Sequence, residues 1–182
     1  MLVVAVRFPE MRLGEVIIQN KGLICIAGAE QGDALAAFRL ALLVEDKKVD
    51  PGVYGSAGDW YNRSCELGGI VSCHNAAVGY ENGSLGLPKD YAKARTLYLK
   101  GANKGYLQSQ YNVDGLYANK YFNDDIEGLK WFLLANKAAR LCQSDSLCSW
   151  ILSDPPGHMK KLRGRMSKEQ IEKAVGLADS AL

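Results

Sequence analysis

Three stretches of the sequence resemble one another at a nearly constant interval: Ala36-Ala-Phe-Arg-Leu-Ala-Leu-Leu-Val44, Ser72-Cys-His-Asn-Ala-Ala-Val-Gly-Tyr80 and Ser109-Gln-Tyr-Asn-Val-Asp-Gly-Leu-Tyr117. Their first residues are 36 and 37 positions apart. Within each stretch, small residues and larger apolar ones recur at three- and four-residue spacing, which places them on one face of a helix. A repeat of this period is typical of stacked helical hairpins, because one hairpin cannot bury its apolar face alone.

A second pattern follows each stretch and predicts the other helix of the hairpin. Trp60-Tyr61 leads to Gly68, Leu97-Tyr98 leads to Gly105, and Trp131-Phe132 continues the series. Leu23-Ile24 is a weaker, earlier copy. A glycine after a helix favours a left-handed end. Each unit is therefore expected to run from helix A through a loop to helix B and a tight turn.

The predicted fold is all-α: a short right-handed α-solenoid of about three to four helix-turn-helix repeats with a C-terminal capping helix. For that last helix, Ser167 and Gln170 form a capping box ahead of an apolar stripe from Ile171 to Ala178. The expected divisions are an N-terminal segment with an incomplete repeat helix (1–32), the repeats (33–154, as 33–68, 69–105, 106–142 and a partial unit 143–154) and a linker with the capping helix (155–182).

The middle unit resembles a known family. Tyr80-Glu-Asn-Gly83, Leu87-Pro-Lys-Asp-Tyr-Ala-Lys-Ala94 and Lys104-Gly105 are similar to the signature of the Sel-one-like repeat family, relatives of tetratricopeptide repeats, over residues 27 to 142. The resemblance implies a protein-binding solenoid whose A helices line its inner face. The first copy has Lys47-Lys-Val-Asp-Pro-Gly52 and the third has Asn119-Lys-Tyr-Phe122 in place of the Gly-rich loop. We expect the loops of those two units to differ.

The cysteines bear on the compartment. Resemblance to the cysteine-rich, secreted branch of the family implies a disulfide between Cys65 and Cys73. We also expect a disulfide between Cys142 and Cys148, although the register of this pair departs from that branch. Cys25 is left over and is expected to be a buried free thiol. Two disulfides would place the protein in the periplasm or outside the cell. The cytoplasm is the alternative, because Arg7 and Arg12 follow the apolar residues 1–6, whereas a signal peptide carries its basic residues first.

Composition and motifs exclude several function classes. The 22 basic and 20 acidic residues give a net charge of +2, which offers no reason to expect nucleic acid or an acidic membrane as partner. The apolar runs fall far short of the roughly 20 residues that span a bilayer, so no membrane insertion is expected. No Cys-x-x-Cys pair, P-loop, Gly-x-Ser-x-Gly or Ser-x-x-Lys motif is present, so we expect no metal, no cofactor and no enzyme. The alternative is an enzyme of the cysteine-rich branch that binds or hydrolyses a β-lactam or cell-wall peptide.

Alignment of the three copies points to a binding surface. Arg39, Asn75 and Asn112 occupy one position, with an aromatic ring or imidazole just before it and Leu42, Val78 or Gly115 three residues after. Aromatic and arginine side chains dominate interface energies and amides fix register. The predicted partner-binding residues are Phe38, Arg39, Leu42, His74, Asn75, Val78, Tyr111, Asn112 and Asp114. That Phe38 and Tyr111 instead belong to the core stays open at this point.

Asp114 is unusual because it replaces Ala41 and Ala77 at a small, close-packed position. A buried carboxylate must find a partner, face the groove or mark local unwinding before Gly115. The basic run 158–165 is expected to be a solvated linker, with contact to an acidic partner as the alternative. The functional hypothesis is a non-catalytic module, a monomer or small oligomer, that binds one partner protein on its concave face or loops. A bacterial immunity protein or inhibitor that occludes a secreted effector or toxin is the specific form that the resemblance suggests.

Overall fold

The computed structural model describes residues 13–142, 146–154 and 156–181. The interpretation of residues 1–12 as lacking an intact signal peptide, and the first three residues of the partial unit 143–154, lie outside the described residues.

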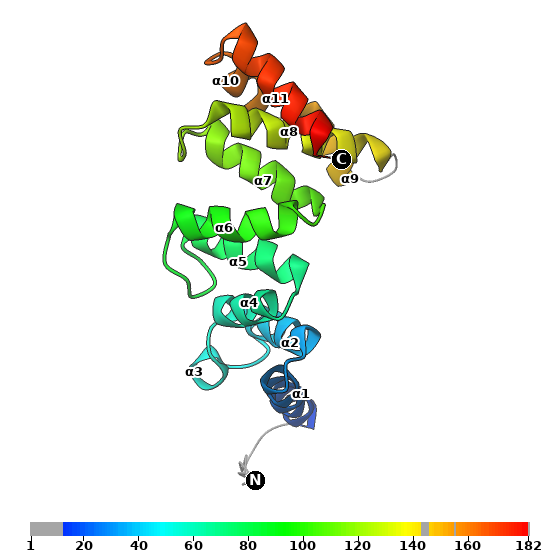
Figure 1. Cartoon of the computed structure of the whole chain (residues 1–182). Coiled ribbons are helices and arrows are strands. Elements are labelled where there is room, and N and C mark those ends of the chain that lie inside the picture. Colours follow the sequence, from blue (N-terminus) through cyan, green and yellow to red (C-terminus); the bar gives the residue numbers. More distant parts are fainter. Residues whose placement is uncertain (1–12, 143–145, 155, 182) are drawn as a thin grey trace.

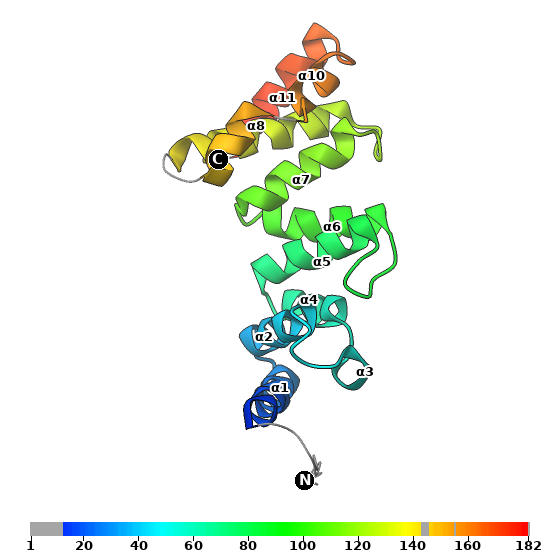
Figure 2. The ribbon, with the colours of Figure 1, turned by 180° about the vertical axis from the view of Figure 1, so that it is seen from behind.

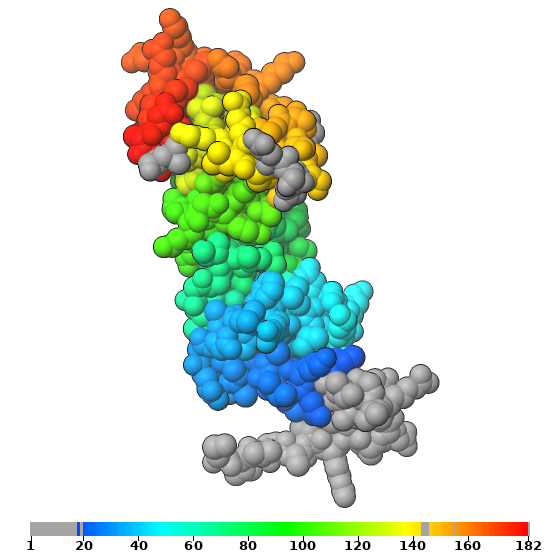
Figure 3. All heavy atoms as spheres, turned by 90° about the vertical axis from the view of Figure 1, so that its right-hand side faces the viewer, coloured from blue at the N-terminus to red at the C-terminus, as the bar shows by residue number. Residues whose placement is uncertain are grey.

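All regular structure in the described residues is helical, and the helices follow one another in a single stack (Figure 1). The same order is seen from behind (Figure 2), and the side chains of the successive units form one elongated body (Figure 3). The helices are α1 (Leu13–Glu30), α2 (Ala34–Glu45), α3 (Pro51–Tyr54), α4 (Ala57–Glu66), α5 (Ile70–Asn82), α6 (Tyr91–Ala102), α7 (Leu107–Ala118), α8 (Asp125–Leu141), α9 (Ser146–Ser153), α10 (His158–Arg163) and α11 (Lys168–Ser180).

Local sequence signals set the helix ends. Asp90 caps α6 by accepting a hydrogen bond from the Lys93 backbone N–H at 3.0 Å, and Asp124 accepts one from the Glu127 backbone N–H at the start of α8, also at 3.0 Å. Gly105 has a φ of +79°, which confirms the predicted left-handed stop after helix B. The capping box of α11 is present with both of its hydrogen bonds.

The repeating small residues allow close helix packing. Ala41 and Ala77 are fully buried, and Ser72 and Ser109 are buried at the start of their A helices. The B helices contribute large buried side chains to the core, among them Tyr61, Tyr98 and Phe132. The period of the sequence therefore corresponds to the period of the packing.

The loops between helix A and helix B differ as expected. The first contains the one-turn helix α3, whose N-terminus is capped by Asp50. The second folds Leu87 onto α4 and α5, where Gly58 and Gly79 lack the Cβ atoms that would clash with it. The third brings Phe122 against Tyr117, with ring centroids 5.8 Å apart.

The segment after α9 is not a solvated linker, so that expectation is wrong. It forms α10, in which His158 and Leu162 are buried against the stack. Arg165 donates to both carboxylate oxygens of Asp125, one of these contacts being 3.0 Å from Nε to Oδ2, and to the carbonyls of Tyr117 and Ala118 at 3.1 Å. The guanidinium of Arg165 is therefore paired and hydrogen-bonded within the fold. Among the described helices, none is long and apolar enough to cross a membrane.

Candidate protein-binding surface

The junctions between successive units are closed by a repeated set of polar contacts. Tyr98 of α6 donates a hydrogen bond from its hydroxyl to Glu81 at 2.7 Å and accepts one from the Asn112 amide at 3.1 Å. One unit earlier, the Tyr61 hydroxyl donates a hydrogen bond to Glu45, and the side chain of nearby Asn75 opposes the rise in the pKa of Tyr61. Burial and the neighbouring glutamate raise the pKa of both tyrosines, so their hydroxyls stay protonated. We call each set a Glu-Tyr-Asn ladder.

These ladders account for two residues that were expected to bind a partner. Asn112 donates its amide N–H to the Tyr98 hydroxyl across the repeat junction, and Asn75 lies at the equivalent position near Tyr61. His74 lies between Tyr98 and Tyr106, with ring centroids at 5.4 and 5.3 Å, and its Nδ1 is 3.2 Å from the Ser109 hydroxyl. Burial lowers the pKa of His74 to about 4, so the ring is neutral at pH 7.

Asp114 and Tyr111 do not face a groove, because the C-terminal helices cover them. Asp114 is fully buried and pairs with Nδ1 of His158 from α10. His158 stacks on Tyr111, and Trp150 meets that ring in a T-shaped contact, each at a centroid distance of 5.1 Å. Burial, only partly offset by the histidine, raises the pKa of Asp114 to about 7. Tyr111 therefore belongs to the core and not to a binding surface. The partner of the buried Asp114 carboxylate is His158. Val78 also packs against the core.

Gly115 makes room for this arrangement. A Cβ at this position would lie 3.0 Å from Cε1 of His158. Its equivalents in the two preceding A helices are Leu42 and Val78. The third A helix is therefore adapted at two consecutive positions, 114 and 115, to receive the histidine ring.

The junction between α1 and α2 lacks a ladder and opens into a groove of about 470 Å³. Ile24 stands where Tyr61 and Tyr98 stand in the following B helices, and Arg39 stands where the ladders have asparagine. Ile24 is 70% exposed, and Leu42 lies on the opposite wall with Arg39. Near their turn the two helices approach closely, because a Cβ on Gly28 would lie 2.8 Å from that of Ala36.

A second, apolar hollow of about 310 Å³ lies on the other side of α2. Phe38, half-buried against Tyr61, forms one wall together with Leu35. Ile70 and Val71 of α5 form the other, and Leu35 is 50% exposed. Of the nine predicted partner-binding residues, Phe38, Arg39 and Leu42 are thus the ones that line these two hollows.

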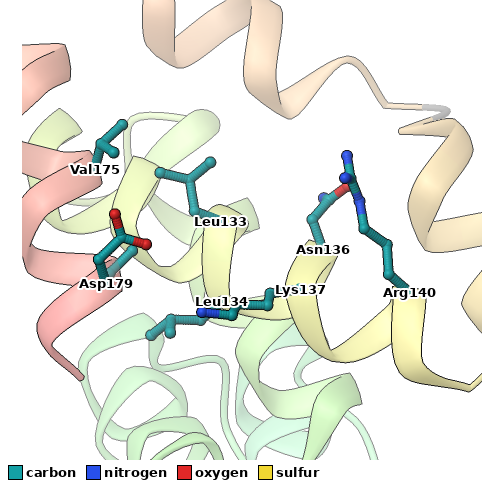
Figure 4. Close-up of a pocket in the computed structure, with 8 residues that line it drawn as sticks. Leu133, Leu134, Asn136, Lys137, Arg140, Val175 and Asp179 are labelled. Atoms are coloured by element: carbon teal, nitrogen blue, oxygen red, sulfur yellow. The ribbon is translucent and has the colours of Figure 1, made fainter. Parts of the chain in front are cut away.

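A third hollow of about 370 Å³ lies between the capping helix and α8 (Figure 4). Val175 and Asp179 from α11 lie across from Leu133, and Asn136, Lys137 and Arg140 extend along α8. This hollow involves none of the residues predicted from the repeat alignment.

Both expected disulfides are present. Cys65–Cys73 joins the end of α4 to α5 with a Cα separation of 4.6 Å, and Cys142–Cys148 joins the end of α8 to α9 at 6.3 Å. Cys25 is free but only half-buried, since it lines the α1–α2 groove. Burial raises the pKa of its thiol, and nearby Arg39 partly opposes that effect. In the described residues, no cluster of three or more His, Cys, Asp or Glu side chains could hold a metal ion.

Several residues of this surface were missed from the sequence. Lys21, Ile24, Leu35, Ile70 and Val71 line the two hollows. The available signal was the mismatch of Ile24 and Arg39 with the tyrosines and asparagines at the same repeat positions. It could be interpreted only once the ladder that those residues replace was visible.

Comparison with known proteins defines the class of fold. The crystal structure of c5321, a protective antigen present in uropathogenic Escherichia coli strains and displaying an SLR (Sel-one-like repeat) fold, aligns with a TM-score of 0.52 at 18% identity, over 88% of this chain and 48% of that one. A Sel1 repeat protein from Oxalobacter formigenes aligns with a TM-score of 0.54 at 22% identity, over 72% of this chain and 96% of that one. The chain therefore has the Sel-one-like repeat fold, as its resemblance to that family and its all-α solenoid pattern predicted.

Sequence comparison adds one curated relative. The chain is 32% identical over 74 residues to cytochrome c oxidase assembly factor 7A of Xenopus laevis. The match covers 41% of this chain and 31% of that protein, so it spans less than a third of the relative's length. No family model matches the chain.

Proposed function

We propose that this chain is a non-catalytic protein-binding module that holds a partner against α1, α2 and the start of α5. The observation that carries the proposal is the pair of hollows on either side of α2, in which apolar side chains stay exposed. Exposed apolar side chains gathered around a concavity are typical of a protein-binding surface. A relative named as an assembly factor is consistent with a protein partner.

We further propose that the partner is a secreted effector or toxin and that the module inhibits it by covering its active site. The two disulfides support residence in an oxidising compartment, for which we propose the periplasm or the cell exterior. A short, cross-linked solenoid suits such a role because its binding surface is ordered before the partner arrives, which lowers the entropic cost of binding.

The test is capture of partners from the native cells by the tagged chain, followed by mass spectrometry. Leu35→Arg and Val71→Arg place a cation in the α2–α5 hollow at exposed positions, so they should leave the fold intact and abolish capture. Leu177→Arg, at an exposed position of α11, is the matched control and should capture the partner normally. A partner retained equally by all three variants would place the binding surface elsewhere.

The inhibitory role has its own readout. The captured protein should lose its activity when it is mixed with one equivalent of the wild-type chain, and it should keep that activity with Leu35→Arg. A partner that stays fully active in the complex would rule out occlusion while leaving the binding function in place.

A further inference from the structure

The α1–α2 groove lies where a ladder tyrosine lies in the next two junctions, but no aromatic ring of the described residues occupies it here. In the next two junctions, a tyrosine ring sits between helix B and the following helix A. Tyr61 donates a hydrogen bond to Glu45, and Tyr98 donates one to Glu81 and accepts one from Asn112. At the α1–α2 junction, Ile24 replaces the tyrosine and lines the groove with 70% of its surface exposed. The equivalent site therefore holds a tyrosine ring in two later junctions and is open to solvent in the α1–α2 junction.

The groove also carries uncompensated positive charge. Lys48 is paired with Asp46 at 2.8 Å. Lys21 and Arg39, on opposite walls, form no ion pair or hydrogen bond with any residue of the described part of the chain. The floor between them is apolar, with Leu43 and half-buried Cys25. Two free cations around an apolar floor favour a ligand that combines a carboxylate with an apolar ring.

We propose that this groove binds an acidic, aromatic-bearing segment of the partner protein. The ring enters between α1 and α2 against Ile24 and Leu42, as Tyr61 and Tyr98 do in their own junctions. A neighbouring Asp or Glu pairs with Arg39 and Lys21. This inference rests on the proposed function, since it specifies the chemistry of the partner at one of its two hollows.

The direct probe is a fluorescently labelled, stapled helical peptide with one tyrosine and two glutamates on one face, titrated into the full chain by anisotropy. Arg39→Glu and Lys21→Glu should each weaken binding about tenfold or more, and high salt should act in the same direction. Changing the peptide tyrosine to alanine should have a comparable effect. Arg140→Glu removes an exposed cation from α8 and serves as the control that leaves affinity unchanged.

Two further measurements identify the site. A peptide with lysines in place of the glutamates should recover binding to the Lys21→Glu/Arg39→Glu double variant. Saturating acidic peptide should slow alkylation of Cys25 by iodoacetamide under non-reducing conditions, because Cys25 is the free thiol and lines the groove. Circular dichroism of each variant before titration establishes that it is folded.

Several results would overturn the inference. The peptide could fail to bind, its affinity could be unchanged by Arg39→Glu and Lys21→Glu, or Cys25 could be alkylated at the same rate with the peptide bound. A dimer in sedimentation that Ile24→Asp dissociates would assign the groove to a second copy of the chain instead. If the native partner is still captured through Leu35 and Val71 while the peptide fails, the groove chemistry is wrong and the proposed function stands.

Discussion

At the scale of single residues, two buried titratable groups make the stability of the fold depend on pH in opposite directions. His74 is held neutral between two tyrosines, and Asp114 is held next to His158 in the third repeat. Both occupy positions where the other repeats have aromatic rings or alanine. Their effects on stability can be separated by two substitutions. One replaces His74 by the aromatic residue of an equivalent position, and the other replaces Asp114 by a residue that cannot ionise.

The first prediction concerns His74→Phe, which installs the ring found at the equivalent Phe38. The pKa of His74 is lowered to about 4 in the folded state, whereas an unfolded histidine titrates near 6.5. The unfolded chain therefore binds the extra proton as the pH falls through this window, and wild type loses about 2 to 3 kcal/mol relative to His74→Phe between pH 7 and pH 4.5. Urea unfolding at both pH values measures the difference. Equal losses in both proteins would contradict a neutral, buried His74.

The second prediction concerns Asp114→Asn, which keeps an oxygen for His158 but cannot ionise. The folded-state pKa of Asp114 is raised to about 7, above its ordinary value of 3.8, so the native state holds a proton that the unfolded state has released. Wild type should then lose stability relative to Asp114→Asn as the pH rises from about 4 to 7, by a few kcal/mol at about 1.4 kcal/mol per pKa unit. Guanidinium unfolding across this range tests it. Parallel pH profiles for the two proteins would show that Asp114 ionises as an exposed carboxylate does.

At the scale of helices, the Glu-Tyr-Asn ladders set how each hairpin meets the next. The apolar pattern of α4, α6 and α8 predicts which face is buried, but it does not specify the angle or register between neighbouring units. The ladders add directional contacts at two of the junctions. Where the ladder is absent, a groove lies between α1 and α2.

A third prediction follows for Tyr98→Phe. Removing the hydroxyl leaves Glu81 and Asn112 without their shared partner inside the repeat junction, which should cost about 1 to 2 kcal/mol. Tyr106→Phe is the control, because no hydrogen bond of the Tyr106 hydroxyl is found within the described residues. Chemical denaturation of the two variants side by side gives the comparison. A loss no greater than that of the control would mean that the ladder fixes the geometry of the junction but contributes little to the free energy of unfolding.

At the scale of the whole molecule, the solenoid contacts are almost entirely between neighbours, so stability is close to a sum over units and junctions. The first disulfide spans one such junction, from the end of α4 to the start of α5. The C-terminal helices close the other end by covering Tyr111 and Asp114. Tyr111 and Asp114 are consequently not accessible to a partner, whereas the two hollows beside α2 are.

The fourth prediction addresses the first disulfide. Replacing Cys65 and Cys73 together by alanine should lower the free energy of unfolding by about 2 to 3 kcal/mol, because the cross-link restricts the unfolded chain over an eight-residue separation. Urea titration of the variant under non-reducing conditions measures the loss. Addition of reductant to wild type should produce a loss at least as large, since Cys142–Cys148 opens as well. An unchanged unfolding midpoint in reductant would show that neither bridge contributes to stability.

The repeat, its period, the helical hairpins, the cap at Ser167 and the Cys65–Cys73 pairing can be predicted from the sequence, because each follows from local spacing or from a resemblance carried by adjacent residues. The contacts of the aligned polar residues, in contrast, become visible only once the helices are packed. Asn112 is hydrogen-bonded inside the solenoid, Asn75 lies at the equivalent position near Tyr61, and Asp114 is buried against a histidine 44 positions further on. Arg39 alone of its aligned set remains free, because the side chain opposite it is Ile24 rather than a tyrosine. Equivalent positions share a backbone environment, but what each side chain contacts depends on the helix packed against it, and a repeat pattern does not contain that information.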